Sequence, residues 1–306
     1  MRFHQSLTFL PTDQIVPLSV ACDGLGYAGM YLSDHLLHPR KLRSTYTYSD
    51  RADGAPGWDP ATSWPDPMCV FSGLATVTTS LTFTTGVYVA PARDLITVAK
   101  SVATAAVLSA DRVRFGVGVG WCREEFEQTG QEFSTRGRRL DEMIVALRSL
   151  WGGGWVEHHG TYYDVPPCQM NPSPRRPVPI LAGGHSPAAL RRAATLCDGW
   201  IAAGAYRKDE AWRRLGALKD ELAVAGRQDE PFLVYLSLAE RPDVDLYRRF
   251  EDAGVTDMIC APWMSVGAGA DGGADGGADG GADAGLGARL SACERFADRV
   301  VAPLAR

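Results

Sequence analysis

Residues 81–121 read LTFTTGVYVA PARDLITVAK SVATAAVLSA DRVRFGVGVG W, and they hold a strand, a helix and a second strand in succession. Residues 81–89 are rich in Thr, Val and aromatic residues, as β-strands are. Residues 94–108 place apolar side chains at helical intervals, and residues 113–119 again favour a strand. This order predicts two parallel strands joined by a helix.

The same alternation continues through the rest of the chain. Strands are expected at residues 2–9, 31–32, 81–89, 113–119, 178–182, 199–203, 232–238 and 258–261. Helices are expected at residues 15–25, 94–108, 140–151, 186–196, 208–225, 245–253 and, last, 289–304. Eight alternating units predict a (β/α)8 TIM barrel, an α/β fold whose active site lies just beyond the carboxyl ends of its strands.

The length and composition fit one soluble domain that spans residues 1–306. Hydrophobic residues make up 45% and charged residues 22% of the 306 positions, which is ample for a core. The net charge of -5 argues against a nucleic-acid or anionic-membrane partner, because either would need a basic surface. We therefore expect a small-molecule partner.

The cysteines and the amino terminus indicate a cytoplasmic protein. Seven cysteines without any Cys-x-x-Cys spacing favour reduced core thiols over disulfides or a zinc site. The opening MRFHQSLTFL lacks the basic and apolar regions of a signal peptide. No run is long enough to span a bilayer.

Three segments fall outside the repeating pattern. Residues 36–67 have no clear period and carry several aromatic residues, so they form a candidate lid over the barrel. Residues 155–165 resemble a hairpin insertion, and we expect it to wall the substrate pocket together with the lid. Residues 266–287 contain an Ala-Asp-Gly-Gly repeat, which favours a flexible linker before the last helix over a calcium site.

Two glycine-rich segments invite a cofactor interpretation. The Gly-x-Gly-x-x-Gly run at Gly24 to Gly29 closes a predicted helix instead of opening one, so it indicates a turn. Gly183-Gly184-His185-Ser186 instead follows a strand, with Ser186 as helix cap and a proline next. Such a turn can bind a phosphate, although a well-capped turn without a ligand explains these residues equally well.

The other candidates lie at predicted strand ends. His35 follows the second strand and can donate a proton or a hydrogen bond, with Asp34 orienting it. Alternate glycines up to Gly120 remove side chains from one strand face next to Trp121, so a flat ring or tightly packed neighbours can lie there. Glu125, with Arg136 and Asp141, fits a charged network on the barrel rim better than a chemical role.

Taken in order, these stretches resemble the luciferase-like monooxygenase superfamily and most of all its F420-dependent branch. The resemblance spans nearly the whole chain. It is carried by SDH at residues 33–35, TGVYVAPARD at 85–94, LSADRVRFGVGVGW at 108–121, the Glu-Phe pair at 125–126, residues 136–142, and GGHS at 183–186 through DGW at 198–200.

The resemblance implies a cofactor that lies across the barrel mouth. Its phosphate would lie at Gly183, Gly184, His185 and Ser186, and a non-prolyl cis peptide bond between Gly86 and Val87 would support its ring, with Gly120 and Trp121 nearby. His35 would be the active-site histidine. Some F420-dependent members carry a glutamate where this chain has Trp121, and Glu125 is a possible substitute.

The resemblance leaves the cofactor and reaction open. With coenzyme F420 the enzyme would exchange a hydride with a small organic substrate, whereas with FMN it would be a monooxygenase served by a separate reductase. A protein that binds flavin or F420 without catalysis is a third interpretation. A homodimer is expected by resemblance, and the substrate cannot be read from the residues.

Overall fold

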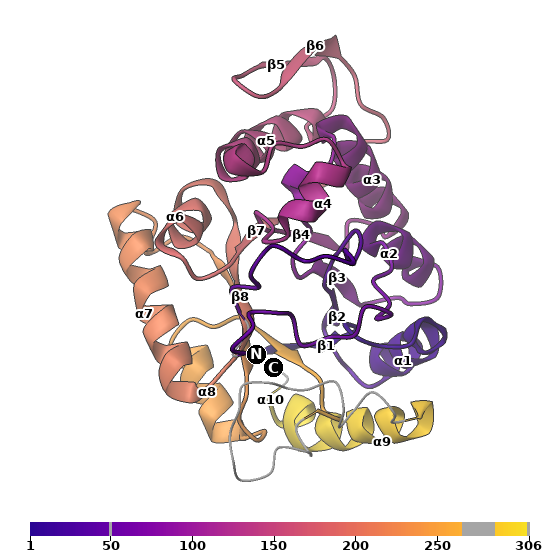
Figure 1. The fold of residues 1–306 in the computed structure, drawn as a ribbon. Coiled ribbons are helices and arrows are strands. Elements are labelled where there is room, and N and C mark those ends of the chain that lie inside the picture. Colours follow the sequence, from indigo (N-terminus) through magenta and orange to yellow (C-terminus); the bar gives the residue numbers. More distant parts are fainter. Residues whose placement is uncertain (49–50, 265–284, 305–306) are drawn as a thin grey trace.

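In this computed structural model, eight parallel strands close into a barrel in the order β1-β10-β9-β8-β7-β4-β3-β2. Helices surround the barrel, and their colours follow the chain around it (Figure 1). The structure describes residues 1–48, 51–264 and 285–304. The predicted (β/α)8 barrel is thereby confirmed.

The barrel strands coincide with the eight segments predicted from the sequence. They are β1 (Arg2–Ser6), β2 (Gly29–Leu32), β3 (Thr82–Thr85), β4 (Val113–Val117), β7 (Ile180–Gly183), β8 (Gly199–Tyr206), β9 (Leu233–Leu238) and β10 (Asp257–Cys260). Each is buried over at least half of its residues because the strands have side chains inside the barrel on one face and helices on the other.

The helices alternate with these strands. They are α1 (Thr12–Gly24), α2 (Pro67–Ala75), α3 (Leu95–Leu108), α4 (Arg123–Gln128), α5 (Arg136–Trp151), α6 (Pro187–Leu196), α7 (Lys208–Val224), α8 (Val244–Asp252), α9 (Leu286–Phe296) and α10 (Ala302–Leu304). No helix among the described residues combines the length and apolar character that crossing a bilayer requires. Helix α1 ends at Gly24, where the sequence indicated a turn, and Asp94 caps α3 by accepting the Thr97 amide.

Helix α2 was missed by the sequence analysis. It begins inside the segment expected to be irregular, where Asp66 caps it by accepting the amides of Met68 and Cys69. Cys69 lies exposed on this helix, so the expectation of core thiols is wrong at that position. The last helical region begins at Leu286, two residues inside the predicted linker, while residues 266–284 lie outside the described residues.

A histidine–carboxylate pair, His4 and Asp257, lies inside the barrel near the amino ends of the strands. His4 Nε2 and Asp257 Oδ1 are 2.6 Å apart, and both side chains are fully buried. Arg114 Nη1 and Arg2 Nη2 lie 3.0 and 2.7 Å from the same carboxylate. We call these four residues the lower network. The sequence analysis assigned His4 no role.

Candidate functional site

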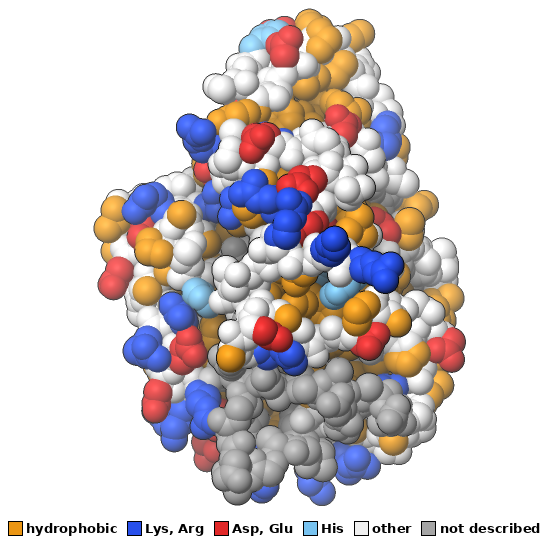
Figure 2. All heavy atoms as spheres, viewed as in Figure 1, with side chains coloured by type: hydrophobic (Ala, Val, Ile, Leu, Met, Phe, Trp, Pro, Cys, Tyr) orange, Lys and Arg blue, Asp and Glu red, His pale blue; other side chains and the backbone are white. Residues whose placement is uncertain are grey.

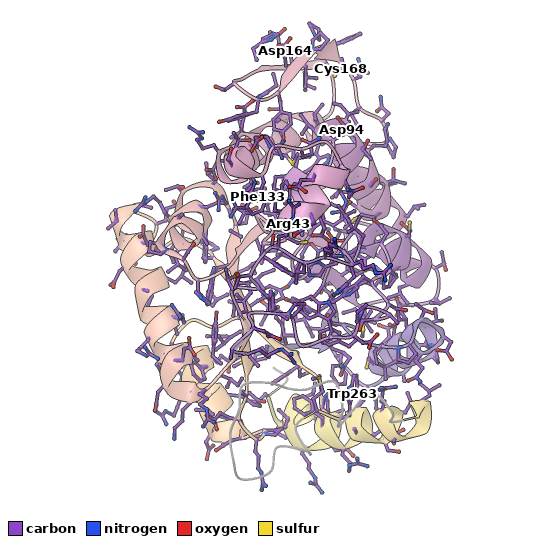
Figure 3. All side chains as sticks on the ribbon, viewed as in Figure 1. Arg43, Asp94, Phe133, Asp164, Cys168 and Trp263 are labelled. Carbon is purple, nitrogen blue, oxygen red and sulfur yellow. The ribbon has the colours of Figure 1, made fainter. Side chains whose placement is uncertain are left out.

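The segments that follow β2, β3, β4 and β7 meet at the carboxyl end of the barrel. The view in Figure 2 looks onto this face, where hydrophobic side chains line the hollow and Lys and Arg side chains gather across the middle. Arg43 and Phe133 are labelled beside α4 on the same face in Figure 3. Most residues predicted for the site are therefore brought to one end of the barrel.

Ser33, Asp34 and His35, directly after β2, each bind a different part of this face. Ser33 Oγ donates to the Gly86 carbonyl at 2.8 Å. Asp34 accepts two hydrogen bonds from the Arg93 guanidinium, at 2.7 and 2.9 Å, and one from the Val89 amide at 2.9 Å. Asp34 therefore holds the segment after β3 and does not orient His35, which corrects the expectation from the sequence.

His35 is oriented by Glu125 instead. Its Nδ1 lies 3.1 Å from Glu125 Oε1, which also accepts the Leu36 amide at 2.7 Å. Because this oxygen already acts as an acceptor, we assign the proton to His35 Nδ1, which leaves Nε2 as the basic nitrogen. Glu125 is fully buried, and its second oxygen, Oε2, has no hydrogen-bond partner among the described residues.

The peptide bond between Gly86 and Val87 is cis, as the resemblance implied. Tyr31 Oη donates to the Gly86 carbonyl at 2.7 Å, beside the bond from Ser33. A Cβ atom at Gly86 would lie 1.7 Å from the Tyr31 ring, so only glycine fits there. The sequence analysis missed Tyr31, whose position inside a short buried strand gave no sign of this contact.

Val87 fills the space left by two glycines, one directly after β4 and one at the end of β7. A Cβ atom at Gly118 would meet Val87 Cγ2 at 2.3 Å, and one at Gly183 would meet Val87 Cγ1 at 2.3 Å. The cis bond after β3 and the turn after β7 are therefore in direct contact. This contact gives Gly183 a packing role in addition to the predicted phosphate role.

The alternate glycines after and within β4 are explained by the neighbouring segment. A Cβ at Gly116 would meet the Thr85 carbonyl at 2.0 Å, and a Cβ at Gly120 would meet Val89 at 2.6 Å. With Val87 against Gly118, every second residue of one segment faces a glycine of the other. Of the two explanations left open by the sequence, tight packing is the one these contacts support, and contact of a cofactor ring with Gly120 stays a prediction.

The turn after β7 has the geometry of a helix start. Gly184 has φ +107°, a conformation that favours glycine, and its carbonyl accepts the Trp200 indole N–H at 2.6 Å. Ser186 caps α6 by accepting the Ala189 amide at 3.2 Å. The first turn of a helix leaves further amides without intrahelical partners, so donors for an anion remain here.

His185 turns toward aromatic side chains. Its Nδ1 is 2.9 Å from Tyr206 Oη, and its ring meets the Tyr48 ring edge-on at 5.4 Å between centroids. Burial lowers the pKa of His185 and raises the pKa of Tyr206 to about 12. Both groups are therefore neutral at neutral pH.

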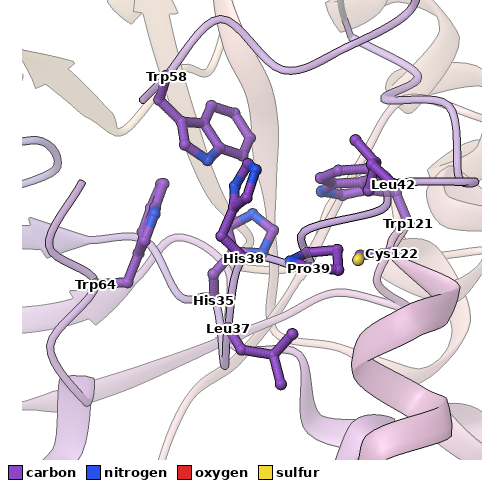
Figure 4. Close-up of a pocket in the computed structure, with 9 residues that line it drawn as sticks. All are labelled: His35, Leu37, His38, Pro39, Leu42, Trp58, Trp64, Trp121 and Cys122. Carbon is purple, nitrogen blue, oxygen red and sulfur yellow. The ribbon is translucent and has the colours of Figure 1, made fainter. Parts of the chain in front are cut away.

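The loop between β2 and α2 covers the barrel mouth with aromatic rings. Figure 4 shows its Trp58 and Trp64 around His35, with Trp121 on the opposite side. The His35 centroid lies 5.3, 4.8 and 5.7 Å from those of Trp58, Trp64 and Trp121. These rings and their neighbours enclose a small pocket lined by His35, Leu37, His38, Pro39, Leu42, Trp58, Trp64, Trp121 and Cys122.

The hairpin at residues 155–165 does not line this pocket. The expectation that it walls the pocket together with the loop is therefore wrong. Strands β5 (Val156–His159) and β6 (Asp164–Cys168) lie on the far side of α5 from the barrel, at the top of Figure 1. The Glu142 carboxylate of α5 accepts amides of the hairpin turn, including those of Tyr162 and Tyr163. Of the predicted rim network, Arg136 donates to the Gly120 carbonyl and Asp141 accepts from Arg192, whereas Glu125 binds His35 and backbone amides instead.

A comparison with protein families matches residues 4–239 to the luciferase-like monooxygenase model. An uncharacterized protein of Mycobacterium tuberculosis is 36% identical over 259 residues, which cover 85% of this chain and 88% of the relative. An F420-dependent glucose-6-phosphate dehydrogenase of Microbacterium testaceum is 28% identical over 76% of this chain and 66% of its own length. The pyrimidine monooxygenase RutA of a Bradyrhizobium species is 26% identical over 65% and 58%, respectively.

Solved structures share the fold at low identity. The monooxygenase RslO1 from Streptomyces bottropensis superimposes with a TM-score of 0.72 at 16% identity, over 100% of both chains. The coenzyme F420-dependent tetrahydromethanopterin reductase from Methanopyrus kandleri gives a TM-score of 0.67 at 14% identity, over 99% of both chains.

Proposed function

The chain belongs to the luciferase-like monooxygenase family of oxidoreductases, and we propose that it transfers a hydride between an F420-type deazaflavin and a small organic substrate. One observation carries this proposal. Val87 packs into the hollows at Gly118 and Gly183, so the cis bond and the capped turn form one continuous floor. His35, which follows the strand next to β3, lies at the same end of the barrel.

The residues at this floor fit such a cofactor. The amides of the first turn of α6, beside Gly184 and Ser186, offer donors and a positive dipole end to a phosphate. Gly86 and Val87 would lie under the ring, and Trp121 beside it. Trp121 Nε1 and Glu125 Oε2 are buried without a hydrogen-bond partner among the described residues, which fits a site that is completed by a bound molecule.

The side chains of this protein would position reactants and move a proton. When bound, an F420-type cofactor supplies the hydride chemistry. His35 Nε2 accepts or releases the accompanying proton, while Glu125 keeps the imidazole in one tautomer and orientation. The aromatic loop excludes water from the reacting atoms.

The similarity to an F420-dependent glucose-6-phosphate dehydrogenase supports the choice of F420. The similarity to a pyrimidine monooxygenase supports a second candidate, an FMN-dependent monooxygenase supplied with reduced flavin by a separate reductase. In the second case FMN would occupy the same floor. The expected homodimer stays a prediction by resemblance.

A titration of the purified protein with F420 and with FMN, followed by cofactor fluorescence, tests the proposal. We expect F420 to bind at least tenfold more tightly than FMN. His35→Asn should slow hydride transfer about 100-fold, the loss expected for a general acid, with little change in cofactor affinity. The matched control is His159→Asn, whose side chain is 60% exposed on the hairpin.

Other outcomes would point elsewhere. Tighter binding of FMN, with oxygen consumption by the reduced protein, would replace the proposal with the monooxygenase. Binding of F420 without turnover in a substrate panel, and no effect of His35→Asn, would indicate a non-catalytic binding protein.

A further inference from the structure

The pocket beside His35 has an unusual lining. None of the nine lining residues is Asp, Glu, Lys or Arg, although charged side chains are common elsewhere on this face. Three of the nine are tryptophans, which offer flat apolar surfaces. A charged ligand would lose its hydration here without gaining an ionic partner from the lining.

One polar atom of the lining has no partner. Trp121 Nε1 is buried and makes no hydrogen bond among the described residues. An indole N–H can only donate, and leaving it unpaired inside a protein is unfavourable because the hydrogen bond to water is lost without replacement. Trp200 provides the contrast within this chain, because its buried Nε1 donates to the Gly184 carbonyl at 2.6 Å.

We propose that this pocket receives an uncharged, planar and mainly apolar substrate, and that an oxygen of this substrate accepts a hydrogen bond from Trp121 Nε1. The inference rests on the proposed function, since it names the class of substrate that would react beside His35. It makes Trp121 a residue that determines specificity.

The substrate enters by displacing rings of the loop. The enclosed space is about 10 Å³, which is barely enough for one water molecule. Trp58 and Trp64 meet edge-on at 5.3 Å between centroids, and both belong to the loop that precedes α2. Trp121 lies at the other wall, next to α4, and stays to receive the ligand.

Equilibrium dialysis of the wild-type protein with three probes tests the proposal. Coumarin is planar, uncharged and carries a carbonyl oxygen, naphthalene lacks the oxygen, and coumarin-3-carboxylate adds a negative charge. We expect coumarin to bind about fivefold more tightly than naphthalene, the effect of one neutral hydrogen bond. The carboxylate should bind at least tenfold more weakly than coumarin.

A variant then assigns the hydrogen bond. Trp121→Phe keeps an aromatic ring but removes the N–H, so the preference for coumarin over naphthalene should disappear. The matched control is Trp155→Phe, because Trp155 is 75% exposed beside the hairpin and should leave all three affinities unchanged. In the wild type, the indole ¹H–¹⁵N resonance absent from Trp121→Phe should shift with coumarin and not with naphthalene.

The measurements separate this inference from the proposed function, because dialysis and the indole resonance need no cofactor. No binding of coumarin, equal binding of the three probes, or a coumarin preference that survives Trp121→Phe would each overturn the substrate class. Failure of F420 to bind would overturn the proposed function alone. If the variant does not fold, the wild-type probe ratios still decide.

Discussion

Two buried histidine–carboxylate pairs lie at opposite ends of the same barrel, and they have different surroundings. In the lower network, His4 and Asp257 are fully buried, and Arg2 and Arg114 share the carboxylate. At the mouth, His35 keeps 13% of its side chain exposed, and Glu125 has no ion-pair partner but His35 among the described residues.

The comparison shows that a histidine beside a carboxylate does not by itself define a chemical site. Asp257 pairs with the mostly buried Arg114 and with the half-exposed Arg2, so its task is to balance the charge of the Arg114 guanidinium inside the barrel. Glu125 receives His35 and backbone amides only, and His35 lines the pocket. An open neighbourhood with uncompensated groups, rather than the type of residue, marks the candidate site.

The largest effect is expected from breaking the lower network. Asp257→Asn leaves Arg114 buried without its counter-charge, which should lower the free energy of unfolding by about 3–5 kcal/mol. Urea unfolding monitored by circular dichroism measures this change. Asp245→Asn is the control, because its carboxylate is 87% exposed and its pair with Arg248 should contribute less than about 1 kcal/mol. Equal losses in both variants would contradict the role given to Asp257.

A smaller and more local effect is expected at the mouth. Glu125→Ala leaves the Leu36 amide and His35 Nδ1 without their acceptor, so the free energy of unfolding should fall by about 2 kcal/mol. Residues 36–66 should also be cleaved faster by protease than in the wild type. Glu127→Ala is the control, since its half-exposed carboxylate binds only Arg43 in ion pairs of the described residues. Cleavage spread evenly over the chain would argue against a local role.

The smallest effect concerns pH. Burial lowers the pKa of His4 from its ordinary value of 6.5, so the folded state resists a proton that the unfolded chain takes up. Stability should therefore fall as the pH drops below about 6.5, because the unfolded chain then takes up a proton that folded His4 resists.

His4→Gln tests this origin, because glutamine stays neutral and can still donate to Asp257. The variant should lose less stability than the wild type over the same pH interval. At lower pH both should weaken further: burial alone would raise the pKa of Asp257, but His4, Arg114 and Arg2 hold it below its ordinary value. An unchanged slope in His4→Gln would assign the dependence to other groups.

Local signals in the sequence predicted much of the fold and some of the site. Strand and helix periods placed all eight barrel strands, and the order of Ser186 and Pro187 indicated the helix cap. What sequence could not provide were partners far apart in the chain. Asp34 and Arg93 are 59 residues apart, and His35 and Glu125 are 90 apart, so neither pairing follows from a local pattern.

Glycines and inserted segments were also hard to interpret, because their contacts too are with residues distant in the chain. A missing side chain predicts that something fills the gap, but the residue that fills it at Gly118 is Val87, 31 positions earlier in the segment after β3. The hairpin was expected to wall the substrate pocket together with the loop that precedes α2. Contacts with Glu142 on the outside of α5 hold it elsewhere.

The interlocking of Val87 with Gly118 and Gly183 limits how this scaffold can be redesigned. A larger residue at either glycine requires a smaller residue at position 87. The three positions must therefore be changed together. The aromatic loop contacts the turn after β7 through Tyr48 and His185, which lie outside this trio. Directed evolution of new selectivity should therefore begin in the loop and leave that trio untouched.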